Sequence, residues 1–240
     1  MRSQRGVHYD ETSWKVEREK QRHHAWVMTG TETPEAAFVC GKSRGKGVAE
    51  EIKGKNTNHI GITDGYVTYQ NLFERHQLCW AHPQRKFRDL SQSETLDTDG
   101  RERCKQTYES FSLLYHDLRE ALKEPFHIEK RKKARSGFLT RLDTIAETNA
   151  NDPKKLATLK ESLQKNRESY FTCLLHDGIP PDNNKAERPL RHLVLKRKIS
   201  FGSKTEEGAK TTSVLASVLL SLFWSKPKDF FGEYMRVRRV

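Results

Sequence analysis

The stretch Asp182–Ser203 reads DNNKAERPLRHLVLKRKISFGS, and the rest of the chain is organised around it. It places one carboxylate, Glu187, in a block with six Lys or Arg side chains. One explanation is local: Asn184 is a good helix N-cap, and Glu187 lies at the capping-box spacing after it. The other is functional: Glu187 holds a metal ion, and the basic side chains bind the phosphates of a polyanion. The basic side chains expected to bind phosphates are the five that follow Glu187, namely Arg188, Arg191, Lys196, Arg197 and Lys198.

The bulk composition favours a globular protein with an acidic partner. The chain has 240 residues, 34% apolar content and a formal net charge of +12. This length fits one large domain or a domain with an insertion. Nucleic acid is favoured over a membrane as the partner, because no amphipathic segment combines the cations with exposed aromatic residues. No signal peptide and no apolar run of about 18 residues is present, so we expect a soluble intracellular protein.

The four cysteines, at positions 40, 79, 104 and 173, are far apart in the sequence. No C-x-x-C pair occurs, which argues against a disulfide framework and against a structural zinc site. Cys79 and His82 form a C-x-x-H, but the second half of a zinc site is missing. We therefore expect reduced thiols in a cytoplasm.

Short strands dominate the first part of the chain. The segments VHYDETSWKVE from Val7, HHAWVMTG from His23 and EAAFVCGK from Glu35 predict three successive antiparallel strands. In the first strand Asp10 shares a face with His8 and Thr12. Strands disfavour carboxylates, so Asp10 is either functional or lies on the solvated face of an edge strand.

A second group of elements follows. VAEEIKG predicts a short helix, and HIGITDGYVTY predicts a strand that ends at Asp64-Gly65. A strand end presents its carboxylate at the edge where open α/β sheets bind ligands, although Asp-Gly is also an ordinary turn signal. Residues 76–82, HQLCWAH, predict another buried strand, and PQRKFRDL predicts the start of a basic helix.

From about Ser91 to His176 the apolar residues recur at helical spacing, which predicts an all-helical block. Its basic run at 129–135 reads as a solvated face or as a contact to DNA. The last predicted helix, Glu206–Ser225, ends before Pro227. It carries an apolar stripe that we interpret as core packing: Val214, Leu215, Val218, Leu219, Leu222 and Phe223.

This order of elements predicts a ribonuclease-H-like fold: a mixed α/β sheet flanked by helices and interrupted by an all-helical insertion. In such a fold the first and fourth strands lie side by side, so Asp10 and Asp64 become neighbours. A later helix then brings Glu187 over them.

Four motifs are spread over almost the whole chain. They read Asp10-Glu11-Thr12-x-Trp14, Asp64-Gly65-Tyr66, Cys79-Trp80-Ala81-His82-x-x-Arg85-Lys86-Phe87 and Asn183-Asn184-x-Ala186-Glu187-Arg188-x-Leu190-Arg191. The pattern continues through Arg197-Lys198 and Phe201-Gly202-Ser203 to Gly208-Ala209. In these motifs and their order, the chain resembles the catalytic region of the insertion sequence 66 family of bacterial transposases, which are of the DDE class.

The resemblance implies a catalytic triad of Asp10, Asp64 and Glu187 that binds two Mg²⁺ or Mn²⁺ ions and cuts and joins DNA strands. It implies a catalytic domain in two parts, 1–90 and 179–225, with a helical insertion at 91–178 and a tail at 226–240. The partners would be transposon ends, target DNA, further copies of the chain and other transposition proteins, in a bacterial cytoplasm at the nucleoid. DNA contacts would come from the basic residues beyond Glu187 and from Arg85 and Lys86, with His82 and Arg85 positioning a phosphate. For Trp80 and His82 a buried structural role is the alternative.

Two departures from the family pattern bear on these expectations. His192 stands where the family often has proline, and Pro189 falls early in the predicted helix, where it would kink the helix. Only nine residues precede Asp10, so we expect this chain to lack the N-terminal region that recognises transposon ends. A basic DNA-binding remnant without catalysis and a nuclease that cuts without joining are the alternative functions.

Overall fold

The computed structural model describes residues 3–55 and 57–237, and it is a mixed α/β protein. The chain divides into two compact units. Residues 1–76 and 183–240 form one, which we call the sheet unit, and residues 77–182 form the other, the helix unit. Each is described separately below.

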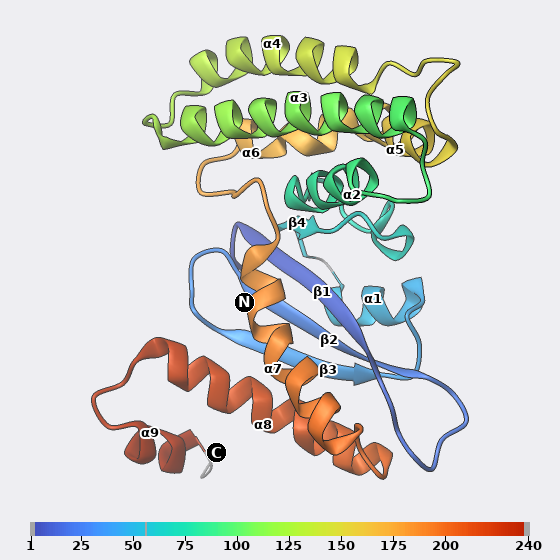
Figure 1. Cartoon of the computed structure of the whole chain (residues 1–240). Coiled ribbons are helices and arrows are strands. Elements are labelled where there is room, and N and C mark those ends of the chain that lie inside the picture. Colours follow the sequence, from blue (N-terminus) through green and yellow to red (C-terminus); the bar gives the residue numbers. More distant parts are fainter. Residues whose placement is uncertain (1–2, 56, 238–240) are drawn as a thin grey trace. The chain divides into compact units, whose positions relative to one another are not determined.

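One mixed sheet has the strand order β3-β2-β1-β4-β5. Figure 1 labels the first four strands of the chain, β1 to β4. Its strands are β1 Gly6–Trp14, β2 His23–Gly30, β3 Ala36–Gly41, β4 Ile60–Thr63 and β5 His76–Leu78. The first three pair antiparallel, as predicted, whereas β1 and β4 pair in parallel. The predicted adjacency of the first and fourth strands is therefore confirmed.

The predicted strand at 76–82 is too long. β5 ends at Leu78, and helix α2, Ala81–Ser91, begins three residues later. Pro83 lies in the first turn of this helix, where a missing backbone N–H is tolerated, and it would interrupt a strand ladder. A short apolar run alone does not distinguish a strand from a buried helix start.

The two faces of the sheet are covered by different elements. On one face, Val7 and Tyr9 of β1 pack with α1, Lys46–Lys53, and with the segment around the 3₁₀ turn η1, Val67–Tyr69. On the other face, Trp14 of β1 packs with α7, Asn184–Ser200, and α8, Glu206–Ser225 (Figure 1). Because side chains alternate along a strand, Asp10 belongs to the face that α7 covers.

The interpretation of the α8 stripe as core packing is wrong. Val214 is 61% exposed and Phe223 is 63% exposed, while Ala209 and Ser213 are buried. The face that meets the sheet instead carries Ala209 and Ser213, with Leu220 and Trp224 half-buried against the core and with two serines that bond β3. Ser217 Oγ accepts a hydrogen bond from Phe38 N at 2.8 Å, and Ser221 Oγ accepts one from Ala36 N at 3.0 Å. These serines satisfy backbone N–H groups of β3, which is an edge strand of the sheet that the described residues form.

The helix unit is built around an aromatic cluster. Trp80 stacks on Phe111 with ring centroids 4.9 Å apart and on Tyr115 at 5.6 Å, and its Nε1 donates to Tyr170 O at 2.7 Å. The buried structural role for Trp80 is therefore confirmed. The helices of this unit after α2 are α3 Thr98–Lys123, α4 Ile128–Ala146, α5 Lys154–Lys165, η2 Arg167–Phe171 and α6 Thr172–Leu175.

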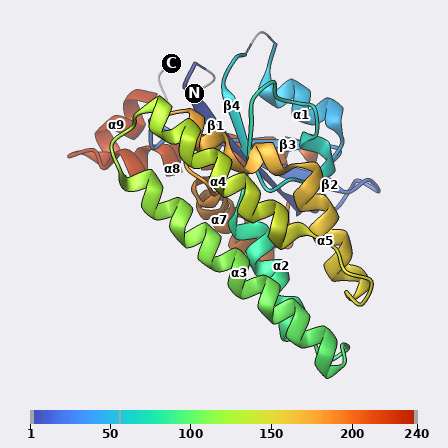
Figure 2. The same ribbon diagram turned by 90° about the horizontal axis from the view of Figure 1, so that it is seen from above.

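Within the helix unit, α3 and α4 run alongside each other as a long pair (Figure 2). Phe111, Leu114 and Leu118 on α3 and Leu142 on α4 are buried, which agrees with the helical spacing of apolar residues in the sequence. A last helix, α9, Phe230–Val237, follows α8 in the sheet unit. No helix within residues 3–55 and 57–237 is both long and apolar enough to span a membrane.

Candidate active site

Asp10 lies in β1, and Asp64 lies directly after β4, the parallel neighbour of β1. His8 of β1 pairs with Ile62 of β4, and each aspartate comes two residues later in its own strand direction. Asp64 is the first residue after β4. Its Oδ1 accepts a hydrogen bond from Tyr66 N at 2.9 Å, and Asp10 Oδ1 accepts one from Glu11 N at 2.8 Å. Both carboxylates are thus oriented by backbone N–H groups near the carboxyl end of β4.

Helix α7 is attached to β1 at its first turn. Asn183, the N-cap residue, donates from Nδ2 to Tyr9 O at 2.8 Å. Its Oδ1 therefore accepts, and His8 Nδ1, at 2.9 Å, is the donor. Burial lowers the pKa of His8 to about 4, so the imidazole is neutral at pH 7. The helix starts beside the two residues that precede Asp10.

The capping-box interpretation of Glu187 is wrong. Asn184 is the first residue of the helix, so it is not the N-cap, and the true N-cap residue directs its side chain to β1. Pro189 lies inside α7 and is buried, and the helix is continuous from residue 184 to residue 200. Glu187 therefore sits in the first turn, where helix N-termini favour a negative charge.

The far end of α7 is also attached to β1. Ser203 Oγ accepts from Trp14 Nε1 at 3.1 Å, and Ser203 N donates to Lys15 O at 2.9 Å. Gly202 adopts φ +110°, and a Cβ there would lie 2.2 Å from Lys15 O. Only glycine fits such a close approach at positive φ. With both ends fixed, the helix follows β1 and Glu187 lies at the Asp10 end.

The three predicted carboxylates interact electrostatically. The pKa of Asp10 is raised well above its usual value, first by burial and then by the negative charge of Asp64. Glu11 and Glu187 contribute further negative charge in the same direction. Charges shift a pKa in this way only when they are close in space. Asp64 and Glu187, which are 54 and 177 positions from Asp10 in the sequence, therefore lie near it and form one electrostatic cluster with it.

Glu11, which the sequence analysis did not select, is a second buried carboxylate of β1. It points to the opposite face of the strand from Asp10, where Tyr69 and Arg44 both bond its carboxylate. Burial raises the pKa of Glu11, and the two hydrogen bonds oppose that shift. Both oxygens are occupied within the protein, so Glu11 is a supporting residue here.

The basic residues of α7 that follow Glu187 divide into two kinds. Most are exposed, namely Arg188, Arg191, Lys196 and Lys198. Arg197 is half-buried, and its Nη1 donates to Thr12 Oγ1 at 3.1 Å and to Ser13 Oγ at 2.6 Å. It also donates to the carbonyl oxygen of Ser13. Arg197 therefore fastens α7 to β1, a role that its place in a basic run did not indicate.

The remaining predicted site residues, His82, Arg85 and Lys86, lie on α2 in the helix unit. Lys86 is exposed, and His82 and Arg85 are half-buried. Their predicted contacts with a phosphate stay predictions.

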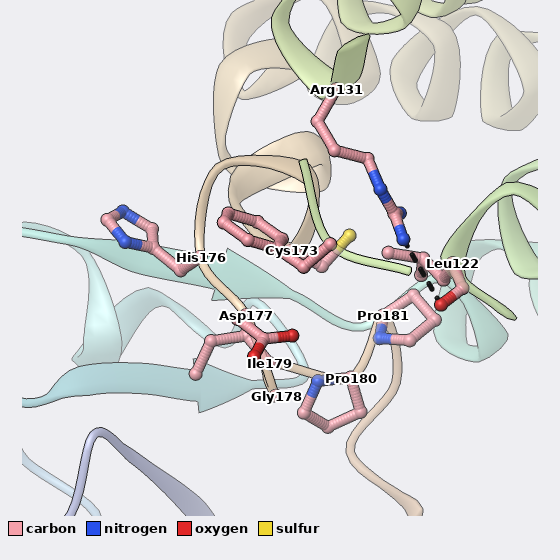
Figure 3. A pocket seen from close by; sticks show the side chains of 10 residues that line it. Leu122, Arg131, Cys173, His176, Asp177, Gly178, Ile179, Pro180 and Pro181 are labelled. Carbon is pink, nitrogen blue, oxygen red and sulfur yellow. Dashed lines mark hydrogen bonds between the residues drawn. The ribbon is translucent and has the colours of Figure 1, made fainter. Parts of the chain in front are cut away.

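A cavity of about 320 Å³ lies in the helix unit (Figure 3). Arg131 and Cys173 line it, and Arg131 Nη2 donates to Leu122 O at 3.2 Å and Glu124 O at 2.8 Å. Such bonds satisfy carbonyls at the end of α3. Burial raises the pKa of the Cys173 thiol to about 12, so this thiol is unreactive. The three carboxylates do not line this cavity.

The donor set of the carboxylate cluster suits a hard divalent cation, since Mg²⁺ and Mn²⁺ prefer carboxylate oxygens. Burial, and after it the negative charge of Asp64, raises the pKa of Asp10, and a bound cation would relieve the like-charge repulsion. As the side chains stand, no three His, Cys, Asp or Glu groups in the described part of the chain are arranged to hold a metal ion.

Comparison with known proteins adds the family. The family model described as "Transposase IS66 family" matches residues 1–211, which include every strand, α7 and all three carboxylates. No curated protein matches the chain. With the match covering far more than half of the 240 residues, the chain belongs to the IS66 family of transposases.

Proposed function

We propose that this chain is a DDE transposase catalytic region, in which Asp10, Asp64 and Glu187 form the metal-binding triad for strand cleavage and transfer. The observation that carries the proposal is the placement of Asp10 in β1 and of Asp64 directly after its parallel neighbour β4, with Asp10 electrostatically coupled to both Asp64 and Glu187. Family membership supports a role in transposition. The strand order, with β1 between an antiparallel and a parallel neighbour, supports a ribonuclease-H-like fold.

The three carboxylates would together hold two divalent ions. Mg²⁺ or Mn²⁺ bound there would supply positive charge that offsets the charge developing on the oxygens of an in-line displacement at phosphorus. The backbone N–H groups of Glu11 and Tyr66 keep the two aspartates in place for this role. Asn183 does the same for Glu187, because it fixes the first turn of α7 on β1.

The exposed cations of α7 begin one residue after Glu187, so DNA phosphates bound by them would lie along the same helix. Arg188 and Arg191 are the nearest in sequence. We propose that these residues position the backbone of a transposon end or a target, because phosphate contacts set orientation without reading sequence. Arg85, Lys86 and His82 are proposed as further phosphate contacts, and further copies of the chain as partners on DNA.

The test is cleavage and joining of labelled transposon-end DNA by the purified protein with Mg²⁺, with Mn²⁺ and with EDTA. We expect metal-dependent products that disappear in Asp10→Asn, Asp64→Asn and Glu187→Gln. The matched control is Glu207→Gln, which neutralises an exposed carboxylate of α8 in the same unit and should leave activity unchanged.

The alternative functions give different outcomes in this assay. A non-catalytic DNA-binding remnant binds the DNA and yields no products with either metal. A nuclease yields cleaved strands without joined ones. Activity that survives in Asp64→Asn or Glu187→Gln would show that the triad is wrongly assigned.

A further inference from the structure

Arg44 lies in the loop between β3 and α1, directly before Gly45, the N-cap of that helix. Its guanidinium bonds the buried Glu11 carboxylate through two nitrogens: Nε and Nη2 are each 2.6 Å from Oε1. Tyr69 OH donates to the other oxygen, Oε2. The Glu11 side chain is 0% exposed, and that of Arg44 is 39% exposed. Arg44 is therefore the cation that makes a buried carboxylate next to Asp10 tolerable.

Arg44 also holds the segment that follows β4. Its Cζ lies 3.5 Å from the centroid of the Tyr66 ring, which is a close cation–π stack. Its carbonyl oxygen accepts a hydrogen bond from Thr68 Oγ1 at 2.7 Å. Through Glu11, it shares a carboxylate with Tyr69. Three of the four residues from 66 to 69 thus contact Arg44 or its ion-pair partner.

This segment carries Asp64 at its start. Tyr66, whose ring stacks on Arg44, is the residue whose backbone N–H donates to Asp64 Oδ1 at 2.9 Å. Between them Gly65 adopts φ +84°, a conformation accessible mainly to glycine. Asp64 has already left the strand ladder, so β4 alone does not fix its carboxylate. The stacked Tyr66 fixes it instead.

We propose that Arg44 is a positioning residue for the metal-binding triad: by pairing with Glu11 and stacking on Tyr66 it holds the Asp64 carboxylate beside Asp10. This inference rests on the proposed function for its consequence, which is tighter metal binding. Its structural part, that Arg44 fixes the conformation of residues 64–69, does not depend on the proposed function. A planar guanidinium is required, since an ammonium group cannot bond the carboxylate through two nitrogens and stack flat on a ring at once.

The experiment compares Arg44→Lys and Tyr66→Leu with the parent protein. Hydrogen exchange of the backbone amides of residues 64–70 reports how rigidly this segment is held in place. Mn²⁺ titration followed by electron paramagnetic resonance reports metal affinity. We expect exchange of this segment to accelerate at least tenfold in both variants and the Mn²⁺ Kd to rise about tenfold, at the lower end of the range for residues that orient metal ligands. The kcat on DNA should fall more than KM rises.

The matched control is Lys42→Gln. Lys42 lies in the same loop and also pairs with a carboxylate, Glu206, at 2.5 Å, but that carboxylate belongs to α8. This variant should match the parent in exchange of residues 64–70 and in Mn²⁺ affinity. Removing the Arg44 charge outright would leave Glu11 buried and unpaired, so the double variant Glu11→Gln/Arg44→Gln replaces the single Arg44→Gln. It should fold and show the same faster exchange.

Parent-like exchange of residues 64–70 in folded Arg44→Lys and Tyr66→Leu would overturn the proposal. Parent-like Mn²⁺ affinity in these variants, with exchange accelerated, would overturn its consequence for the triad. Failure of the parent itself to bind Mn²⁺ would instead refute the metal-dependent function, and the exchange measurement would still decide the contact between Arg44 and the segment.

Discussion

Asp10 and Asp64 each follow the paired residues His8 and Ile62 by two positions, and the negative charge of Asp64 acts on Asp10. Neighbouring like charges oppose folding unless a proton or a cation is bound. Burial, and after it the charge of Asp64, raises the pKa of Asp10 well above its usual value.

Asp10→Asn should therefore melt at a higher temperature than the parent in EDTA, because it removes one of the repelling charges. It should also lose most of the increase in Tm that Mn²⁺ produces in the parent. A metal that binds only the folded state stabilises it by about 2.7 kcal/mol at a hundredfold excess over Kd. Thermal melts of both proteins with EDTA and with Mn²⁺ provide the measurement. Equal metal responses in the two proteins would contradict a converging triad.

The stability of the protein should fall as the pH is lowered from about 6.5 to about 4. Burial lowers the pKa of His76 in the folded protein from 6.5 to about 4. Between these values the unfolded chain binds a proton that the folded protein excludes, so acid favours unfolding. One histidine contributes a slope of at most about 1.4 kcal/mol per pH unit in this window, and its contribution is fully present above it.

The measurement is urea denaturation of the parent and of His76→Gln across this pH range. Subtracting the two curves cancels the carboxylates that titrate in the same window. The variant should show the shallower loss of stability, and parallel curves would mean that the pKa of His76 is not lowered in the folded protein.

Mutations on the two faces of α8 should affect stability to different extents. Ser217→Ala and Ser221→Ala each remove a hydroxyl that bonds a backbone N–H of the edge strand β3, and each should lower the free energy of unfolding by about 1–2 kcal/mol. Val214→Ser on the outer stripe should change it by less than about 0.5 kcal/mol, because that side chain is 61% exposed. Chemical denaturation tests both. If Val214→Ser lowered the free energy of unfolding by several kcal/mol, the apolar stripe would be part of the core after all.

Some elements of the fold were predictable from the sequence, whereas the buried face of α8 was not. The strands at 23–30 and 36–41 were predictable because apolar residues occur there at strand spacing between clear turns. The buried face of α8 was not, since hydropathy assigns an apolar stripe to the core. The edge of β3 needs hydrogen-bond acceptors, and the position of an edge strand depends on tertiary pairing.

The candidate site divides in the same way. The adjacency of Asp10 and Asp64 followed from the order of the strands, which fixes which neighbours pair. The supporting residues Glu11, Arg44 and Asn183 were missed, because their partners lie far away in sequence: 33 positions separate Glu11 from Arg44, and 175 separate His8 from Asn183. No local spacing signals such pairs. A buried charge in a strand, as at Glu11, is the one feature that could have prompted a search for a partner.

The basic residues of α7 should differ in role: Arg191 and Lys198 contact DNA, whereas Arg197 stabilises the packing of α7 on β1. Arg191→Gln and Lys198→Gln remove exposed charges, so each should weaken DNA binding similarly for all sequences and reduce the slope of log K against log salt by about 0.9. Arg197→Gln should mainly lower stability, because that guanidinium bonds Thr12 and Ser13 of β1. The control is Lys46→Gln, an exposed cation of α1, which covers the opposite face of the sheet. Fluorescence anisotropy over a salt series, with a thermal melt of each variant, decides between the two roles. If Arg197→Gln reduced the salt slope by about 0.9 and left Tm unchanged, Arg197 would be a DNA contact.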